Sequence, residues 1–114
     1  MDHFFVYITT GNKDEALNIG RMLVQEQLVA CVNILDPMTS VYRWEGKIVE
    51  ESESVLIAKT LKDNIPSLVD RVKQLHSYSC PCIVILPITD GNKDYLQWIE
   101  QECQKGASPP PSSE

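Results

Sequence analysis

Apolar and polar positions recur along the chain in patterns that predict strands and helices in a definite order. Runs rich in β-branched and aromatic residues predict strands over residues 4–10, 28–35, 39–44, 47–60 and 82–88. Apolar residues spaced three and four positions apart predict helices over about 13–27, 62–76 and 94–103. This order is that of an α+β, ferredoxin-like sandwich, a split β-α-β-β-α-β unit, followed by a C-terminal helix.

The two middle strands, 28–44 and 47–60, form a hairpin that is long for such a domain. Glu45-Gly46 supplies the turn, and Asp36-Pro37 interrupts the first strand because proline cannot donate to a ladder. At ~3.3 Å per residue, about sixteen residues reach ~50 Å. A domain of ~100 residues is only ~35 Å across. Either Pro37 bends the hairpin back, or its tip reaches another chain.

The residues near the hairpin tip favour the second alternative. A projecting hairpin would expose apolar side chains and long unpaired strand edges, and both are unfavourable in a monomer. We therefore predict a homo-oligomer whose contacts include Tyr42, Trp44 and Lys47. The alternative is that Tyr42 and Trp44 cover the sheet of their own domain.

Length, composition and charge narrow the class of protein. The 114 residues suit one domain, which we assign to residues 1–105, and the tail GASPPPSSE (106–114) has the composition of a disordered segment. A net charge of −6 argues against binding to nucleic acid, which needs clustered Lys and Arg. Residues 1–16 lack the features of a secretory signal, and no apolar run approaches the ~20 residues of a membrane helix. We expect a cytoplasmic protein that does not bind membranes.

Soft-metal ligands gather in the stretch QLHSYSCPCIVILP (74–87), which contains His76, Cys80 and Cys82. Each also has a structural role to weigh. His76 ends a predicted helix and can cap its carbonyl groups. Cys80 and Cys82 lie at strand spacing on one face and can pack inward together, or they can form a thiol pair for Cu(I). We favour packing for the two thiols, which leaves His76 as the stronger ligand candidate in this stretch.

Other polar residues have two alternative roles as well. Cys31, in the middle of a predicted strand, either packs as a small hydrophobe or contacts a metal. The acidic run Glu50, Glu51 and Glu53 is interpreted as a solvated face, with ion pairs or weak attraction of cations as the alternatives. Lys59 ends an apolar strand and either extends outward to solvent or lines a pocket.

The hairpin sequence LVACVNILDPMTSVYRWEGKIVEESESVLIAKT (28–60) closely resembles the CutA family of divalent-cation-tolerance proteins. The matching features include Ala30-Cys31-Val32-Asn33 and the Trp44-Glu45-Gly46-Lys47 turn, and the resemblance extends over about residues 4–102. It implies a ferredoxin-like protomer in a compact homotrimer whose long strands exchange pairing between protomers. It also implies a link to divalent metals, copper above all.

The same resemblance implies candidate residues. Cys31 and His76 match ligands proposed for copper in the family, and Lys59, Tyr78 and Trp98 would close a cleft between protomers that suits a small anion. This chain has His76-Ser77-Tyr78-Ser79 and Cys80-Pro81-Cys82 where relatives often carry His-Pro-Tyr-Glu and Val-Pro-Glu. Two carboxylates are thus replaced, partly by thiols. That disfavours Mg²⁺ and Ca²⁺ and favours copper or zinc.

We therefore predict a trimeric protein that binds a divalent, copper-type cation and acts in metal tolerance, with Cys31, His76, Cys80 and Cys82 as candidate ligands. The alternative is a PII-like regulatory trimer with a small-molecule cleft between protomers. An enzyme is not expected. The loop Thr9–Lys13 has one glycine and no arginine, unlike the phosphate loop of ferredoxin-like acylphosphatases, and no Ser-His-Asp set is visible. A heavy-metal chaperone would need a Cys-x-x-Cys after the first strand, where no cysteine occurs.

Overall fold

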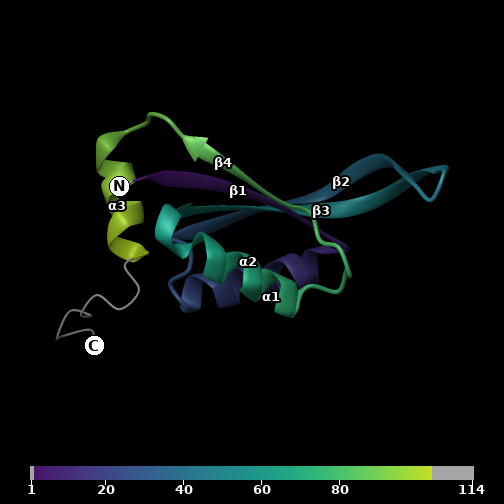
Figure 1. Ribbon diagram of the computed structural model, residues 1–114, viewed down its shortest axis with the longest axis horizontal. Coiled ribbons are helices and arrows are strands. Elements are labelled where there is room, and N and C mark those ends of the chain that lie inside the picture. Colours follow the sequence, from purple (N-terminus) through teal and green to yellow (C-terminus); the bar gives the residue numbers. More distant parts are fainter. Residues whose placement is uncertain (1, 104–114) are drawn as a thin grey trace.

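A computed structural model describes residues 2–103, and the predicted tail lies outside the described residues. The element order agrees with the prediction (Figure 1). The elements are β1 (His3–Thr10), α1 (Lys13–Gln25), β2 (Cys31–Trp44), β3 (Lys47–Leu61), the 3-10 turn η1 (Lys62–Asn64), α2 (Ile65–Leu75), β4 (Ile83–Ile88) and α3 (Lys93–Glu102). No helix in this part of the chain is both long and apolar enough to span a membrane.

The four strands form one antiparallel sheet in the order β2-β3-β1-β4, which confirms the α+β, ferredoxin-like fold. Local sequence sets where its helices begin. The Asn12 side chain accepts a hydrogen bond of 2.8 Å from the Glu15 N–H at the start of α1. At the start of α3, the Asn92 side chain accepts one of 3.0 Å from the Asp94 N–H. Both are N-cap interactions, which satisfy amide groups that have no partner inside the helix.

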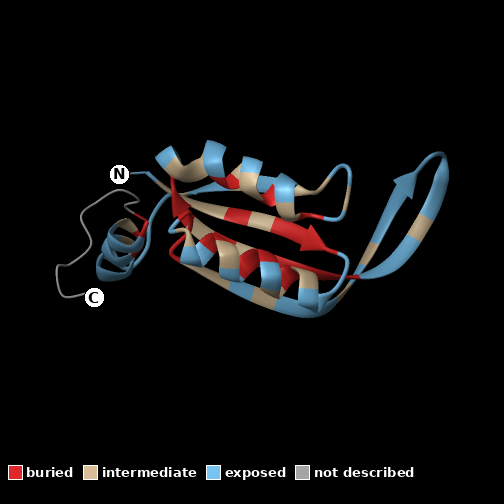
Figure 2. Ribbon diagram, turned by 90° about the horizontal axis from the view of Figure 1, so that it is seen from below, coloured by how far each residue is buried: buried red, intermediate tan, exposed pale blue. Residues whose placement is uncertain are grey.

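Helices α1 and α2 cover one face of the sheet and bury the main core against it (Figures 1 and 2). Val6 and Ile8 of β1 and Leu56 and Ala58 of β3 are fully buried there. Residues that alternate with them point to the opposite face. On that face Leu35, Val84 and Leu86 are 59%, 47% and 49% exposed. A single chain therefore leaves an apolar face of its sheet largely uncovered.

The hairpin β2–β3 projects beyond the body of the molecule, on the side away from α3 (Figure 1). The chain measures 53 × 29 × 23 Å, so the prediction that the hairpin overruns its own domain is confirmed. Pro37 does not bend it back. The ladder shifts register between Leu35 and Met38, at the cis Asp36-Pro37 peptide, and continues to the tip. The predicted break at this proline is thus a bulge within one continuous strand.

The end of α1 and the start of β2 differ from the prediction for local reasons. Helix α1 ends at Gln25, because Gln27 adopts a left-handed conformation with φ of 59° and the Leu28 N–H turns back to the Leu23 carbonyl. Residues 28–30 were predicted as strand because they are apolar. They are instead a buried connection, and β2 begins at Cys31.

Candidate functional site

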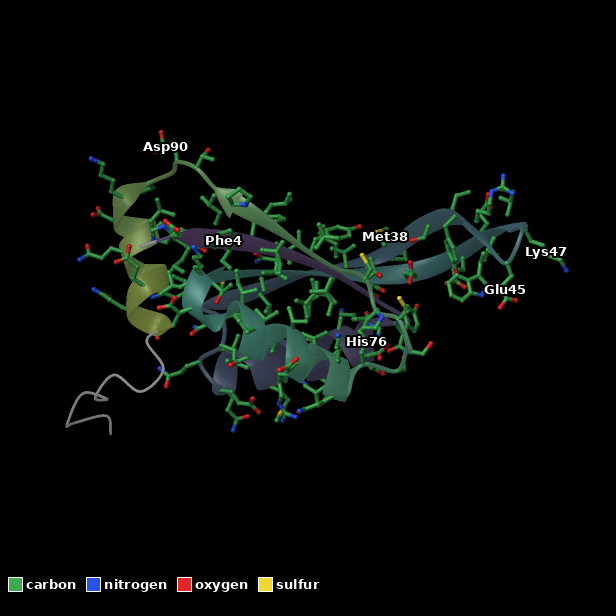
Figure 3. The ribbon with its side chains drawn as sticks, viewed as in Figure 1. Phe4, Met38, Glu45, Lys47, His76 and Asp90 are labelled. Atoms are coloured by element: carbon green, nitrogen blue, oxygen red, sulfur yellow. The ribbon has the colours of Figure 1, made fainter. Side chains whose placement is uncertain are left out.

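His76 lies at the end of α2 and joins the α2–β4 connection to β1 (Figure 3). Its Nε2 lies 2.7 Å from the carbonyl oxygen of Thr9, and its Nδ1 accepts a hydrogen bond of 3.0 Å from the Tyr78 N–H. An acceptor at Nδ1 and a carbonyl at Nε2 assign the neutral tautomer with the proton on Nε2. The side chain is fully buried. Both ring nitrogens thus have protein partners, and a metal would have to displace one of them.

Glu15 of α1 binds the same connection. Its carboxylate accepts hydrogen bonds from the backbone N–H groups of Ser77 (2.7 Å) and Gly11 (3.1 Å), and it lies 3.6 Å from Nδ1 of His76. Burial raises the pKa of Glu15, but the hydrogen bonds from Ser77 and Gly11 outweigh it, and the net shift is downward. The connection that follows α2 is therefore held by both β1 and α1.

A cavity of about 460 Å³ lies between this connection and the hairpin. Its lining combines aromatic rings, carboxylates and thiols with two small hydroxyl residues: Thr9, Tyr42, Trp44, Glu51, Glu53, Tyr78, Ser79, Cys80 and Cys82. We call it the hairpin cavity. None of these lining residues is a Lys, Arg or His, so the cavity is negatively charged and partly apolar.

Glu53 is the buried acid of the hairpin cavity. It is only 7% exposed, and its Oε2 accepts a hydrogen bond of 2.7 Å from the Tyr78 hydroxyl. Burial and the Glu53 contact raise the pKa of Tyr78 far above its ordinary value, so the hydroxyl stays a donor. Glu51, two positions earlier on the same face of β3, accepts a hydrogen bond of 2.7 Å from the Tyr42 hydroxyl. The interpretation of the acidic run as a solvated face is wrong for Glu53.

Cys80 and Cys82 lie on the wall of the hairpin cavity that the α2–β4 connection forms. Both precede β4, which begins at Ile83. Cys80 is exposed and Cys82 is half-buried, and neither is in a disulfide. The prediction that both thiols pack inward as strand residues is therefore wrong for Cys80, because the chain is not yet in the sheet there.

Cys31 belongs to a different cluster, beside α3. Its Sγ lies 3.4 Å from the Tyr95 hydroxyl and 3.8 Å from Nζ of Lys59. Lys59 also donates a hydrogen bond of 2.9 Å to Oδ1 of Asn33 and lies 5.6 Å from the centre of the Tyr95 ring. Tyr95 in turn packs against Trp98, with 5.5 Å between ring centres. Lys59 and Trp98 thus share one cluster, whereas Tyr78 lies in the hairpin cavity.

The structure separates Cys31 from His76. Cys31 pairs through Lys59 with Phe5, whereas His76 contacts Thr9, four positions further along β1. At ~3.3 Å per residue that is roughly 13 Å along the strand. No group of three or more His, Cys, Asp or Glu side chains that could hold a metal ion is present within residues 2–103.

Sequence reasoning missed the pairing of the two carboxylates with two tyrosines. The signal was the spacing of Glu51 and Glu53, which places both on one face of a strand and Glu50 on the other. Their tyrosine partners depend on the cross-strand register and on the path of the α2–β4 connection. Neither can be read from spacing.

Comparisons with known proteins agree on one family. The family model described as CutA1 divalent ion tolerance protein matches residues 4–102. The divalent-cation tolerance protein CutA of Thermus thermophilus is 47% identical over 96 residues, covering 84% of this chain and 93% of that protein.

Solved structures show the same likeness. CutA1 from Oryza sativa has a TM-score of 0.89 and 36% identity, covering 92% of this chain and 96% of that chain. The Archaeoglobus fulgidus structure, described as a periplasmic divalent cation tolerance protein CutA, has a TM-score of 0.86 and 41% identity, covering 90% and 99%. The chain belongs to the CutA1 family of divalent ion tolerance proteins.

Proposed function

We propose that the chain is a homotrimer that binds a divalent, copper-type cation and acts in the response to metal ions, without catalysing a reaction. Family membership supports the link to divalent cations. Copper and zinc are the metals that the thiols of this chain suit best. The CutA relatives give no support to the PII-like alternative.

Two features of the single chain support assembly. The sheet face that carries Leu35, Val84 and Leu86 is apolar and open. The hairpin exposes Tyr42 (37%) and Trp44 (57%), with Lys47 at its tip (Figure 3). Burial of apolar surface between copies stabilises association by roughly 25 cal/mol per Å² before the cost of association is counted. The family resemblance implies that the assembly contains three copies.

The observation that carries the metal proposal is the presence of two thiols, Cys80 and Cys82, on one wall of the hairpin cavity. Thiolates bind Cu(I) and Zn²⁺ strongly. Two donors from one chain do not fill a coordination sphere, so we propose that a neighbouring copy or solvent completes it. Cys31 and His76 lie apart, and His76 is held by Thr9 and Tyr78. We therefore place the metal at the thiol pair.

Native mass spectrometry of the reduced protein tests assembly and metal binding together. Spectra are recorded before and after addition of Cu(I), Cu(II) and Zn(II). We expect trimers with about one metal per chain, and loss of that metal in the double variant Cys80→Ser/Cys82→Ser. The matched control is Cys31→Ser, which removes a thiol from the other cluster and should retain the metal. A monomer would contradict the assembly, and equal loss in both variants would contradict the site.

The cytoplasm is our proposed compartment, because accessible thiols such as Cys80 keep their affinity for metals where they stay reduced. The Archaeoglobus relative is described as periplasmic, and cell fractionation can distinguish a periplasmic from a cytoplasmic protein. Cell fractionation with markers for each compartment should place the protein in the cytoplasm, and recovery in another fraction would contradict the proposal.

A further inference from the structure

The hairpin cavity contains an acidic residue, Glu53, with which no cation among the described residues pairs. Glu53 is more than nine-tenths buried, and its one hydrogen-bond donor is the neutral hydroxyl of Tyr78. Among residues 2–103, the ion pair of Arg71 with Glu26 and the histidine–carboxylate contacts of His3 with Glu100 and His76 with Glu15 do not involve Glu53 or Glu51. A cation that reached this carboxylate would form a charge-assisted hydrogen bond with it.

The second oxygen of Glu53 shows where such a partner would bind. Tyr78 donates to Oε2, and no described donor reaches Oε1. No buried side-chain nitrogen or oxygen among the described residues lacks a partner, so Oε1 is not sealed off from solvent. Glu53 lines the hairpin cavity, so a ligand in that cavity could reach this carboxylate. A ligand with an N–H donor and a positive charge would complete its hydrogen bonding.

The remaining lining favours an organic cation over a bare metal ion at this position. Tyr42, Trp44 and Tyr78 are among its lining residues, the first two being also proposed contacts between copies, and aromatic faces attract ammonium and guanidinium groups. Glu51 lies two positions from Glu53 on the same face of β3, so the two carboxylates are separated by roughly 7 Å along the strand. The volume of about 460 Å³ is in the range of small-ligand sites.

We propose that the hairpin cavity binds a small organic dication, a diamine or an amino-guanidine, with Glu53 as its buried counter-ion and Glu51 as its outer one. Tyr78 holds Glu53 in place by donating to Oε2, which leaves Oε1 for the ligand. The aromatic walls enclose the alkyl chain between the two charged ends. The proposed metal function rests on other residues of the same cavity, the thiols of Cys80 and Cys82.

Isothermal titration calorimetry of the full chain in its native assembly tests the proposal, with putrescine and agmatine as probes. Two control compounds separate the contributions. Tetramethylammonium carries charge without an N–H donor, and 1,4-butanediol carries neither charge nor N–H. We expect putrescine or agmatine to bind at least about tenfold more tightly than either control, because a hydrogen bond to a charged group contributes that much. Equal binding of all four compounds would overturn the proposal.

The substitution Glu53→Gln keeps the size of the side chain and removes its charge. It should weaken putrescine binding at least about tenfold, whereas Glu51→Gln at the exposed outer position should weaken it only about two- to threefold. The matched control is Glu50→Gln, which removes the same charge from the neighbouring position on the opposite face of β3 and should leave the affinity unchanged. Equal losses in Glu53→Gln and Glu50→Gln would indicate attraction to the acidic field alone and overturn the site.

Two further measurements separate this proposal from folding and from metal binding. Glu53→Asp keeps the charge but withdraws the carboxylate, and it should weaken putrescine binding about threefold or more even if Glu53→Gln fails to fold. Copper should be lost in Cys80→Ser/Cys82→Ser and putrescine affinity in Glu53→Gln, whereas Cys31→Ser, whose thiol lies outside the hairpin cavity, should leave both unchanged. If no probe binds the wild-type assembly at millimolar concentration, the cavity is closed, for instance by a neighbouring copy, and the proposal is wrong.

Discussion

The buried imidazole of His76 donates a hydrogen bond of 2.7 Å to the carbonyl oxygen of Thr9, a residue 67 positions earlier in the chain. This contact anchors the start of the α2–β4 connection to the end of β1. The same connection carries Tyr78, Cys80 and Cys82 into the hairpin cavity. The position of one cavity wall therefore depends on a histidine that does not itself line the cavity.

Substitution of His76 by Ala should lower the free energy of unfolding by about 2–4 kcal/mol. It leaves a buried carbonyl without its donor and creates a cavity under the connection. Urea denaturation followed by circular dichroism, at one fixed protein concentration because the protein is expected to assemble, measures the change. The exposed Lys73→Ala on the same helix serves as control and should change stability by less than ~0.5 kcal/mol. Similar costs in both variants would show that the Thr9 bond is not structural.

Glu15 should make stability depend on acid pH. Burial raises the pKa of this carboxyl group, but the hydrogen bonds from Ser77 and Gly11 lower it by a larger amount. The folded pKa therefore lies below the ordinary value of 4.5. A lowered folded pKa stabilises the protein above the unfolded pKa, and that contribution is lost as the pH falls through the folded value. Glu15→Gln should therefore reduce the urea midpoint at pH 7 and approach wild type as the pH falls below 4.5.

A series of urea midpoints at pH 7, 5, 4 and 3 tests this expectation. Asp70→Asn is the control. It removes one negative charge from an exposed position on α2 that does not form the hydrogen bonds of Glu15, so it should differ from wild type by a small amount at every pH. A gap between Glu15→Gln and wild type that stayed constant from pH 7 to pH 3 would contradict the assignment.

Two glycines provide a matched test of how tightly α1 packs on β2. A Cβ on Gly20 would lie 2.9 Å from Cγ2 of Val32 and 3.3 Å from Cδ1 of Leu56, whereas a Cβ on Gly91 would lie no closer than 3.7 Å to Leu96. Gly20→Ala should therefore cost about 1–3 kcal/mol, because overpacking outweighs the ~1 kcal/mol gain in helix propensity. Gly91→Ala should be neutral or slightly stabilising. Thermal unfolding compares the two, and an equal or higher melting temperature for Gly20→Ala would show that α1 moves freely.

The strand and helix order and the long hairpin could be predicted because each rests on local pattern. Alternation places residues on sheet faces, and strand length alone requires the hairpin to project. Pro37 was misjudged, since a bulge lets a strand continue past a residue that cannot donate. The sequence did not indicate that Gln27 ends α1, because the left-handed conformation of this residue is uncommon where there is no special turn chemistry.

The candidate site was harder to predict because its contacts join distant segments. His76 was identified as chemically important, but its partner, the Thr9 carbonyl, is a backbone group that sequence patterns do not show. Glu53 was assigned to solvent with its acidic neighbours, and its contact with Tyr78 from the α2–β4 connection could not be read from the local pattern. Cys31 and His76 were grouped through family resemblance, and the register of β1 with β3 places them at different ends of the sheet.

The four cysteines should react with iodoacetamide in an order set by burial and thiol chemistry. Cys80 is exposed, whereas Cys103 is 1% exposed and packs in the small core beneath α3. Burial raises the pKa of the Cys103 thiol, and the contact with Thr60 offsets this only in part. Iodoacetamide reacts with the thiolate. Near neutral pH, Cys103 therefore forms less thiolate than an ordinary thiol, and its burial also limits access of the reagent.

Alkylation of the reduced, folded protein at pH 7.5, followed by peptide mass spectrometry, measures the four rates. We expect Cys80 to react first and Cys103 about a hundredfold more slowly or more, because its reaction requires local opening of α3. In urea the rates should converge to within a few-fold, which controls for intrinsic differences between the peptides. If Cys103 reacted as fast as Cys80 in the folded protein, α3 would be open in solution. The cluster of Lys59, Tyr95 and Trp98, two of whose members lie on α3, would then not persist.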